Sequence, residues 1–394
     1  MRFLFAANTP RDPYMGASGC DIATIEALRE QGHEVDEVWG TDMPRRIGHP
    51  NLHQLIELPW NYEQVVAQYT VSSSYDVVQV NQPHAYRAAR WYRRSGRSGI
   101  FVNRSHGWEP QVESALHAHV DPRSDRRPWL RKSATRLLRP FLLRHNELVL
   151  RHSDGVVLCS ADDRDFILAR CPAMTPRLLV LAPGLAPAFL ANPAPALSAE
   201  RLHRILHVAN FNACKAPTVV AAVLGTALGA DTRLSATWVC PRQFHGNVTE
   251  LLPPAVRGRI RLLDVMPRDE LLRVYDAHGV FLLLSFMEGF SVSFLEAMSR
   301  GMCVIGTRFD GMKQLVRDGE NGFLVERGDT EVAAARIMHL GRDPALARAL
   351  AGAAAATVGQ FTWERTAREY VDFCQRLLAS KSSGLSAHPL GHRR

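Results

Sequence analysis

Two glutamates, Glu288 and Glu296, occur with seven residues between them in the stretch MEGFSVSFLEAM, directly after the apolar run GVFLLLSF. Burying a carboxylate is costly unless a partner compensates its charge. We expect residues 279–286 to form a core strand, Ser291 to cap a helix, and Gly301 to end it. Glu288 then lies in the turn at the carboxyl edge of a sheet. Glu296 lies in the second helical turn, and its side chain slants back toward the helix start.

This arrangement favours a ligand that carries both phosphate and hydroxyl groups. The first turn of a helix offers unpaired N–H groups and the positive end of the helix dipole, which together bind anions. Gly289 lets a ligand come close to the backbone. Carboxylates on either side can accept hydrogen bonds from sugar hydroxyls, so a sugar nucleotide has the required composition. The competing interpretation is that Glu296 faces solvent and Glu288 caps backbone amides.

The cysteine and histidine patterns argue against other kinds of site. The seven cysteines are odd in number and contain no C-x-x-C pair, and no H-E-x-x-H spacing occurs among the histidines. This pattern indicates a reducing compartment, which we expect to be the cytoplasm, with no disulfide framework and no protein-held metal. We also expect no bound cofactor. No apolar run approaches the roughly 20 residues of a membrane span.

The formal net charge of +8 has its main source in residues 121–152, where nine Arg or Lys residues stand against three acids. The apolar side chains interleaved with them are Trp129, Leu130, Leu137, Leu138, Phe141 and Leu142. A basic face of this kind can lie on a membrane interface. It can equally be a solvated helix pair with a kink at Pro140. The stretch contains no recognised nucleic-acid module, so we do not expect nucleic acid as a partner.

Short apolar strands alternate with helical segments along the whole chain, which indicates parallel sheets with crossover helices. The expected strands are 2–8, 33–39, 75–81, 99–105, 154–160, 177–183, 204–210, 234–240, 259–265, 279–286, 302–307 and 322–326. A Pro- and Ala-rich segment, 181–200, separates two α/β halves. Because open parallel sheets bind ligands beyond the carboxyl ends of their strands, we expect a cleft between the halves. The tail, 381–394, is expected to be disordered.

The stretch EGFSVSFLEAMSRGMCVIGTRFDGMKQLVRDGENGFLV, 288–325, resembles the donor-binding signature of retaining glycosyltransferases of family 4. Further similarities follow in the family's order: MG before ASGCDIATIEALREQGHEV, SHG at 105–107, SDGVVLCS, LAPG and FTWERTAREY. The resemblance implies the GT-B fold, an α/β architecture of two Rossmann-like domains with a ligand cleft between them. Residues 1–187, completed by helix 364–380, would bind the acceptor, and residues 188–363 would bind the nucleotide sugar.

The resemblance also implies roles for single residues in the signature. Glu296 matches the glutamate that holds the ribose hydroxyls of the nucleotide, and Glu288 matches the one that contacts the transferred sugar. Phe290 and Ser291 would offer backbone N–H groups to that sugar or to the diphosphate. Lys215 matches the diphosphate lysine, although an ordinary exposed lysine is the competing interpretation.

Three further positions carry family roles with departures or alternatives. The family's Gly-Arg pair before the lysine is replaced by Ala-Asn, so Asn210 offers a hydrogen bond without charge, and Arg242 is a candidate substitute cation. Gly16 would let the N-terminal loop touch the phosphates, or it forms a plain tight turn. His106 matches the histidine near the reacting sugar, where a purely structural histidine is the alternative.

The implied reaction is metal-independent retaining transfer of a hexose from a nucleotide-diphosphate sugar to a hydroxyl of a glycan, lipid or small molecule, in polysaccharide or glycoconjugate biosynthesis. The resemblance specifies neither the base, the sugar, the acceptor nor the oligomeric state. A glycoside hydrolase that uses Glu288 and Glu296 needs carboxyl groups roughly 5–10 Å apart, and it gives Lys215 no role. Two other functions remain possible. One is a sugar-nucleotide epimerase. The other is a GT-B scaffold protein with weak or no turnover, because Asn210 replaces the arginine of the family.

The basic stretch generates a test of peripheral attachment to the inner face of the membrane. The protein should float with liposomes that contain anionic lipid, and charge reversal at Arg131 and Arg136 to Glu should weaken that flotation, because attraction to anionic headgroups scales with basic charge. Flotation that ignores both the anionic lipid and the charge reversal would refute the contact.

Overall fold

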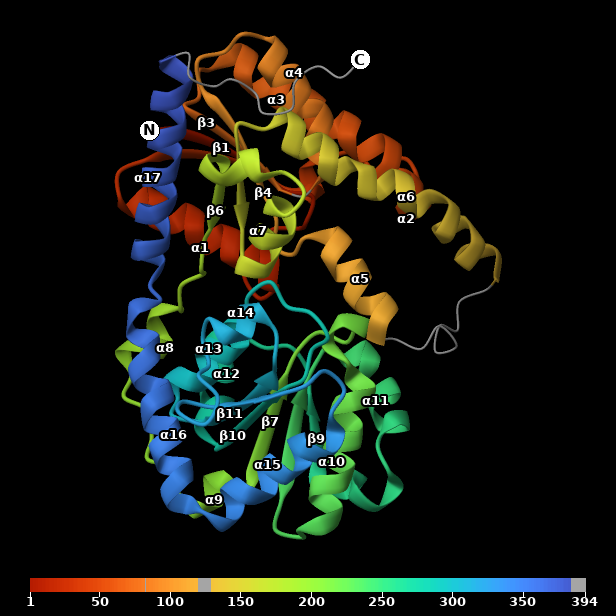
Figure 1. The fold of residues 1–394 in the computed structure, drawn as a ribbon, viewed down its shortest axis with the longest axis vertical. Coiled ribbons are helices and arrows are strands. Elements are labelled where there is room, and N and C mark those ends of the chain that lie inside the picture. Colours follow the sequence, from red (N-terminus) through yellow and green to blue (C-terminus); the bar gives the residue numbers. More distant parts are fainter. Residues whose placement is uncertain (82, 120–128, 384–394) are drawn as a thin grey trace. The chain divides into compact units, whose positions relative to one another are not determined.

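The computed structural model describes residues 1–81, 83–119 and 129–383. The chain divides into two compact units, each built around one six-stranded parallel sheet (Figure 1). Unit 1 comprises residues 1–113, 121–183 and 363–394, and unit 2 comprises residues 114–120 and 184–362. Each unit is described by itself below.

The sheet of unit 1 has the strand order β2-β1-β3-β4-β5-β6. Its strands are β1 (Arg2–Ala6), β2 (Glu34–Val38), β3 (Val77–Asn81), β4 (Ile100–Arg104), β5 (Gly155–Leu158) and β6 (Leu178–Val180). The main helices of this unit are α1 (Gly16–Glu30), α3 (Leu58–Ser72), α4 (Tyr86–Arg94), α6 (Trp129–His152), α7 (Ala161–Leu168) and α17 (Trp363–Ser382). Helix α5 (Glu109–His119) begins in unit 1 and ends in unit 2. All pairings in the sheet are parallel.

The central strands β1, β3, β4 and β5 are buried, which explains why their residues are mainly apolar. Along β1, Phe3 and Phe5 pack with residues of α1 and α17, whereas Leu4 and Ala6 pack with residues of α3 and α4. Successive side chains of a strand point to opposite faces, so one short strand serves two separate hydrophobic layers. The C-terminal helix α17 lies beside α1, although more than 300 residues separate them in sequence (Figure 1).

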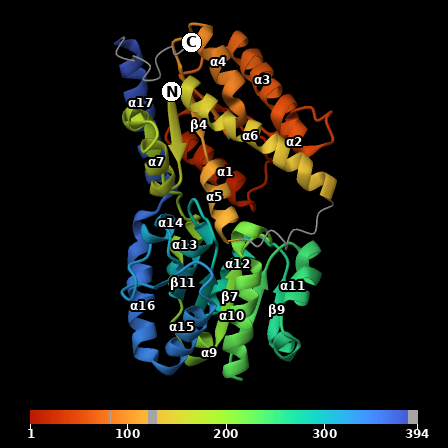
Figure 2. The same ribbon diagram turned by 45° about the vertical axis from the view of Figure 1, so that its right-hand side comes forward.

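The sheet of unit 2 has the strand order β12-β11-β10-β7-β8-β9. Its strands are β7 (Arg204–Val208), β8 (Ser235–Val239), β9 (Ile260–Leu263), β10 (Val280–Leu283), β11 (Cys303–Thr307) and β12 (Phe323–Val325). The main helices are α10 (Pro217–Ala230), α11 (His245–Leu251), α12 (Arg268–Asp276), α13 (Val292–Ser299), α14 (Asp310–Lys313), α15 (Thr330–Arg342) and α16 (Pro344–Thr357). Figure 2 shows the same elements in a second view.

Alternation along β10 again divides two layers. Val280 and Leu282 join the core that contains α10, while Phe281 packs edge-on against Phe294 of α13, with ring centroids 5.8 Å apart. Residues 213–230, which include α10, are long and apolar enough to cross a membrane by length and composition, and 39% of that window is buried. Core helices of soluble proteins meet the same criterion, and the buried face of α10 packs in the core of unit 2.

The predicted elements can be compared with the observed ones directly. Each of the twelve predicted strands is present, and the described residues contain no further strand. The prediction of two parallel-sheet α/β domains is therefore confirmed. The strand predicted at 279–286 is shorter, because the backbone leaves the sheet after Leu283. Helix α13 begins after its N-cap Ser291, as predicted, and Gly301 has a φ of +60°, the left-handed conformation expected there.

The basic stretch 121–152 falls partly outside the described residues, since 120–128 are not described. Its described part, α6, places the apolar side chains on different faces. Leu142 is buried and Leu138 is half-buried, whereas Leu137 and Phe141 are 71% and 55% exposed. Most of the predicted disordered tail, 384–394, also lies outside the described residues.

The core of unit 2 gives a test of the fold. Leu224 of α10 is fully buried, so Leu224→Ala should lower the free energy of unfolding by about 2–5 kcal/mol through the cavity that it leaves. Thr226→Ala, an exposed position on the same helix, should change it by less than about 0.5 kcal/mol. Urea unfolding of both variants measures the difference. Equal stability of the two variants would contradict the packing of α10.

Candidate active site

The order of strands in unit 2 reverses between β7 and β10, because the chain extends from β7 toward β9 on one side and from β10 toward β12 on the other. Open α/β sheets bind ligands at the carboxyl ends of the strands that flank such a reversal, so the loops that follow β7 and β10 are candidates for ligand contact. Lys215 follows β7, and Glu288 follows β10. The sheet topology thus brings together two residues that are 73 positions apart in sequence.

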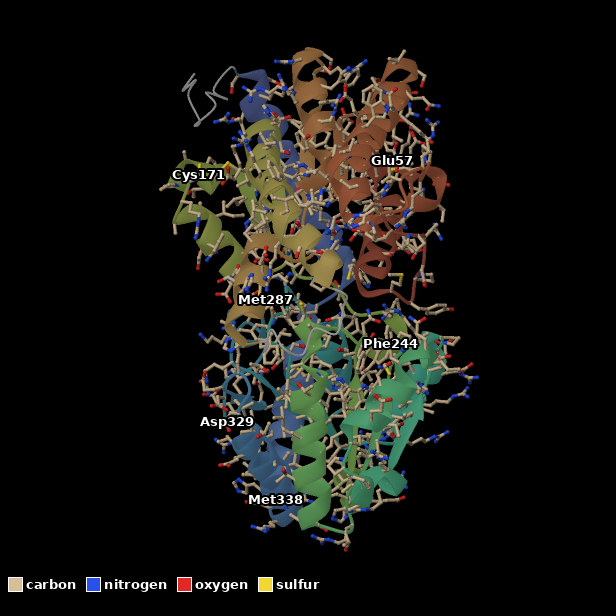
Figure 3. All side chains as sticks on the ribbon, turned by 90° about the vertical axis from the view of Figure 1, so that its right-hand side faces the viewer. Glu57, Cys171, Phe244, Met287, Asp329 and Met338 are labelled. Atoms are coloured by element: carbon tan, nitrogen blue, oxygen red, sulfur yellow. The ribbon has the colours of Figure 1, made fainter. Side chains whose placement is uncertain are left out.

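Glu288 is 8% exposed and forms an ion pair with the ammonium group of Lys215. The hydroxyl of Ser285 donates a second hydrogen bond to the same carboxylate, at 2.6 Å. A backbone hydrogen bond of 2.7 Å from the N–H of Phe286 to the carbonyl of Cys214 fixes the loop that carries the lysine against the end of β10. Met287, labelled in Figure 3, is buried beside Glu288. The carboxylate is therefore held in place from both loops.

The turn at Glu288 and Gly289 is approached closely by the start of α14. A Cβ atom placed on Gly311 would lie 2.8 Å from the carbonyl oxygen of Gly289 and 3.0 Å from that of Glu288. No side chain can be added at position 311 without moving this turn. Glycine at position 311 therefore allows α14 to support the backbone that carries Glu288.

Glu296 is 4% exposed, so the alternative in which it faces solvent is wrong. Its carboxylate accepts hydrogen bonds from Arg268 Nη1 at 2.6 Å and from the Tyr275 hydroxyl at 2.9 Å. Both partners stand on α12, seven residues apart and on one face. Burial raises the pKa of Glu296, and the positive charge of Arg268 together with both hydrogen bonds opposes that rise. The carboxylate is thus oriented by α12 at the second turn of α13.

The start of α13 completes this group of residues. Ser291 is buried, and its hydroxyl accepts a hydrogen bond of 3.3 Å from the N–H of Phe294. Phe290 precedes it and packs near Phe361, with ring centroids 5.9 Å apart. Other N–H groups of the first turn have no partner inside the helix. A negatively charged ligand group is favoured at this end of the helix.

The remaining predicted donor residues of unit 2 lie outside this group. Asn210 is exposed in the loop between β7 and the short helix η6 (Ala213–Lys215). Arg242, the candidate substitute for the missing arginine, is 83% exposed and lies 3.5 Å from Asp264. The arginine that contacts a predicted acid is Arg268, which pairs with Glu296. Among the described residues, no group of three or more His, Cys, Asp or Glu side chains is placed to hold a metal ion.

Unit 1 carries the other two predicted residues. Gly16 is the exposed first residue of α1, and a Cβ atom there would meet nothing within 4 Å, so neither crowding nor its backbone conformation within the unit requires glycine. His106 follows β4 and is only 13% exposed. Its Nε2 lies 3.2 Å from both carboxylate oxygens of Asp21, a buried residue of α1.

Several contacting residues were missed by the sequence analysis. They are Arg268 and Tyr275 around Glu296, Ser285 beside Glu288, and Asp21 beside His106. Among these residues, only Asp21 could have been noticed in the sequence, because its carboxylate directly precedes the largely apolar helical run IATIEAL. Arg268 carries no such signal, since sequence alone does not place α12 beside α13.

Comparison with known proteins agrees with this geometry. Residues 255–357, which include Glu288 and Glu296, match the family described as "Glycosyl transferases group 1". A curated relative, the D-inositol 3-phosphate glycosyltransferase of Corynebacterium urealyticum, is 31% identical over 133 residues. That alignment covers 34% of this chain and 31% of the relative, so the chain matches about a third of the relative's length.

Solved structures resemble the chain over almost its whole length. Sucrose-phosphate synthase from Thermosynechococcus elongatus has a TM-score of 0.76 at 19% identity, covering 96% of this chain and 100% of that chain. HepE of Anabaena, solved in complex with UDP-glucose, has a TM-score of 0.64 at 20% identity, covering 97% and 100%. This similarity shows that the fold is that of GT-B glycosyltransferases.

The site generates a test of Glu296. Replacing Glu296 by Ala removes charge-assisted hydrogen bonds worth about 1.5–3 kcal/mol, so donor binding or turnover should fall roughly ten- to hundredfold. A titration with nucleotide or nucleotide sugar, monitored by calorimetry, measures the change.

The matched control for this test is Glu331→Ala, which removes an exposed glutamate from α15 in the same unit and should bind the donor normally. Circular dichroism checks that both variants fold. An unchanged donor titration for the Glu296 variant would count against the assignment.

Proposed function

We propose that the protein is a retaining glycosyltransferase that moves a hexose from a nucleotide-diphosphate sugar to a hydroxyl acceptor. The observation that carries this proposal is the convergence of Lys215, Glu288, Glu296 and the start of α13 at the switch point of one sheet. Residues 255–357, which contain both glutamates and α13, match the family of group 1 glycosyl transferases. The structurally similar HepE was solved with UDP-glucose, which supports a nucleotide sugar as the donor here.

In this proposal the diphosphate lies at the start of α13 and beside Lys215. The lysine and the helix N–H groups stabilise the negative charge that develops on the departing phosphate, and such fixed electrostatics usually makes the largest contribution to catalysis. Glu296 accepts the ribose hydroxyls, and Glu288 accepts hydroxyls of the transferred sugar. Because Lys215 is itself paired with Glu288, the donor's phosphate and sugar are recognised by two groups that position each other.

Retention of configuration is proposed through front-face attack. The acceptor hydroxyl attacks the anomeric carbon from the side that the diphosphate leaves, and a departing phosphate oxygen takes the hydroxyl proton. The bond from the anomeric carbon to the phosphate oxygen breaks as the bond to the acceptor oxygen forms. This scheme uses neither a protein nucleophile nor a metal ion, and water is excluded so that the donor is not hydrolysed.

The described ion pairs also bear on the hydrolase interpretation. A glycoside hydrolase would need one of the two glutamates as a proton donor and the other as a nucleophile. Here each glutamate is paired with its own cation, Glu288 with Lys215 and Glu296 with Arg268. A carboxylate held by a cation is oriented to accept hydrogen bonds from hydroxyl groups, which is the role that the transferase proposal gives to both glutamates.

Contact with the inner face of a membrane is part of the proposal. Along α6, the exposed positions Arg136, Leu137, Phe141 and Arg144 form one face that combines positive charge with exposed apolar area. Such a face suits an anionic lipid surface. This location would place the enzyme near lipid-linked acceptors in the cytoplasm.

The proposed function is tested in two steps. A thermal-shift screen against UDP, GDP, ADP and dTDP should show one nucleotide that stabilises the protein, because a ligand at 100 times its Kd contributes about 2.7 kcal/mol. The corresponding radiolabelled nucleotide sugar should then pass its sugar to an acceptor in a cell extract, with retention of anomeric configuration. Lys215→Gln should reduce that transfer.

Other outcomes would select a different function. Nucleotide binding without transfer to any acceptor would indicate a binding protein. Conversion of the nucleotide sugar with no acceptor would indicate an epimerase. Release of sugar from an oligosaccharide in the absence of nucleotide would indicate a hydrolase.

A further inference from the structure

A buried carboxylate in unit 1 has no role in the proposed reaction as described so far. Asp21 lies in the second turn of α1, between apolar side chains that pack on the sheet, and it is only 2% exposed. An ionised carboxylate in such a place is costly unless charges or hydrogen-bond donors compensate it. The partners of Asp21 therefore indicate the role of this carboxylate.

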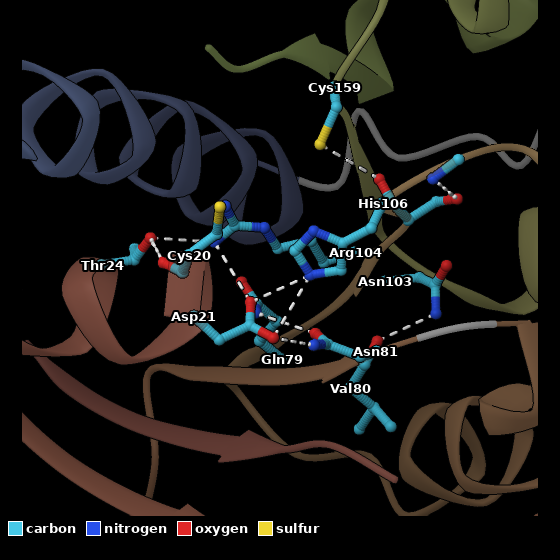
Figure 4. A network of polar contacts seen from close by, with 12 residues as sticks. Cys20, Asp21, Thr24, Gln79, Val80, Asn81, Asn103, Arg104, His106 and Cys159 are labelled. Carbon is cyan, nitrogen blue, oxygen red and sulfur yellow. Dashed lines mark hydrogen bonds and ion pairs between the residues drawn. The ribbon is translucent and has the colours of Figure 1, made fainter. Parts of the chain in front are cut away.

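Three side chains from two neighbouring strands and the loop after them converge on Asp21 (Figure 4). The amide of Asn81, at the end of β3, donates a hydrogen bond of 2.5 Å to Oδ2. Nη1 of Arg104, at the end of β4, lies 3.6 Å from Oδ1. Nε2 of His106 lies 3.2 Å from both oxygens. One carboxylate thus faces a guanidinium and an imidazole at the same time.

Only one member of this cluster reaches the surface of the unit. Asp21, Asn81 and Arg104 are each 4% exposed or less, whereas the His106 side chain is 13% exposed. Arg104 is fixed from the other side by a hydrogen bond of 3.1 Å to the Thr24 hydroxyl. Among these four side chains, His106 is therefore the one best exposed to contact a ligand.

The backbone around His106 is fixed as firmly as its side chain. The N–H of Ser105 donates to the carbonyl of Val157 at 2.9 Å, and the thiol of Cys159 donates to the carbonyl of Ser105 at 3.5 Å. The N–H of Trp108 donates to the buried carboxylate of Asp163 at 3.2 Å. The ring of His106 is consequently held in one orientation, with Nε2 turned inward to Asp21.

The charges in the cluster favour one protonation state of His106. Burial by itself lowers the pKa of His106, but the charge and hydrogen bonds of Asp21, with a smaller contribution from Cys159, raise it to about 9. The same coupling outweighs the effect of burial on Asp21 and lowers the pKa of that carboxyl group. The other ionisable groups that face the cluster are Arg104 from β4, Cys20 from α1, Tyr62 from α3 and Tyr370 from α17.

We propose that Asp21 is a positioning residue that holds His106 as a doubly protonated imidazolium, with Nε2–H directed to the carboxylate. His106 then presents a fixed positive charge, and no proton-accepting nitrogen, to the ligand. In the proposed glycosyl transfer, on which this role rests, His106 stabilises negative charge or donates a hydrogen bond to a sugar oxygen. It does not act as the base that takes the acceptor proton.

This assignment separates two roles that a histidine near a reacting sugar can have. A general base must be neutral at the working pH, whereas an ionised carboxylate directly beside Nε2 favours the protonated imidazole. Both oxygens of Asp21 lie 3.2 Å from Nε2 of His106, closer than the 3.6 Å between Oδ1 and Arg104, so the carboxylate is paired more closely with the imidazole than with the guanidinium. The proton of the acceptor then passes to the departing phosphate, as the front-face scheme requires.

The first experiment needs neither donor nor acceptor. A pH titration of the wild-type protein followed by NMR of the imidazole C–H signals, assigned with His106→Gln, reports the protonation state of His106. We expect the ring to stay doubly protonated through pH 8. A titration midpoint near the ordinary value of about 6.5, or below it, would overturn the proposal whether or not the protein transfers sugar.

The second experiment uses Asp21→Asn, which keeps the size of the side chain and removes its charge. Without the carboxylate, burial should bring the pKa of His106 to about 6.5 or below, so about a tenth or less of the ring is protonated at a pH of about 7.5. The kcat for transfer from UDP-glucose, or from the nucleotide sugar selected by the screen, should fall about tenfold or more at that pH. It should recover as the pH is lowered toward about 6.

A purely structural role would reduce activity at every pH and would not shift the profile. The matched control is Asp36→Asn, which removes a carboxylate of β2 that bonds Arg2 and Tyr75 outside the cluster, and it should leave the pH profile unchanged. An Asp21→Asn profile identical to that of the wild type would overturn the positioning role. Failure of the wild type to transfer sugar would reject the proposed function, while the NMR result would still decide the state of His106.

Discussion

The cost of burying a carboxylate is the constraint on which the rest of this structure depends. Three acids, Asp21, Glu288 and Glu296, are each less than 10% exposed, and each is compensated by a cation from another part of the chain. A buried carboxylate with neither a cation nor hydrogen-bond donors beside it would be strongly destabilising. The need for compensation therefore explains why a basic side chain lies beside each of these acids. These pairs in turn determine which charged groups each unit can offer to a ligand.

The parallel sheets make this compensation possible. Every strand ends at the same edge of its sheet, so the loops after neighbouring strands meet there. In unit 2 the loops after β7 and β10 bring Lys215 to Glu288, and in unit 1 the ends of β3 and β4 bring Asn81 and Arg104 to Asp21. Burial of both faces between helices supplies the stability that these polar clusters do not provide. Large apolar layers thus support a few charged groups at the sheet edges.

Buried ion pairs are weak contributors to stability, because desolvation offsets most of the attraction between the charges. Apolar residues at the positions of Glu296 and Arg268, or of Asp21 and His106, would pack without this cost. The proposed function gives these pairs a role in ligand recognition. Their carboxylates are oriented before the ligand binds. A site whose hydrogen-bonding groups are already fixed needs less reorganisation free energy when the ligand binds or the transition state forms.

The sequence by itself determined the elements of this protein. Alternating apolar runs predicted all twelve strands, and local signals located the cap of α13 at Ser291 and its end at Gly301, because periodicity and capping depend on residues near one another in the chain. Only the tertiary structure determined which side chains contact the predicted site residues. That Arg268 rather than Arg242 contacts a predicted acid, and that Asp21 fixes His106, follows from helices and strands that are distant in sequence. Such contacts depend on the strand order and on helix packing, which local patterns do not encode.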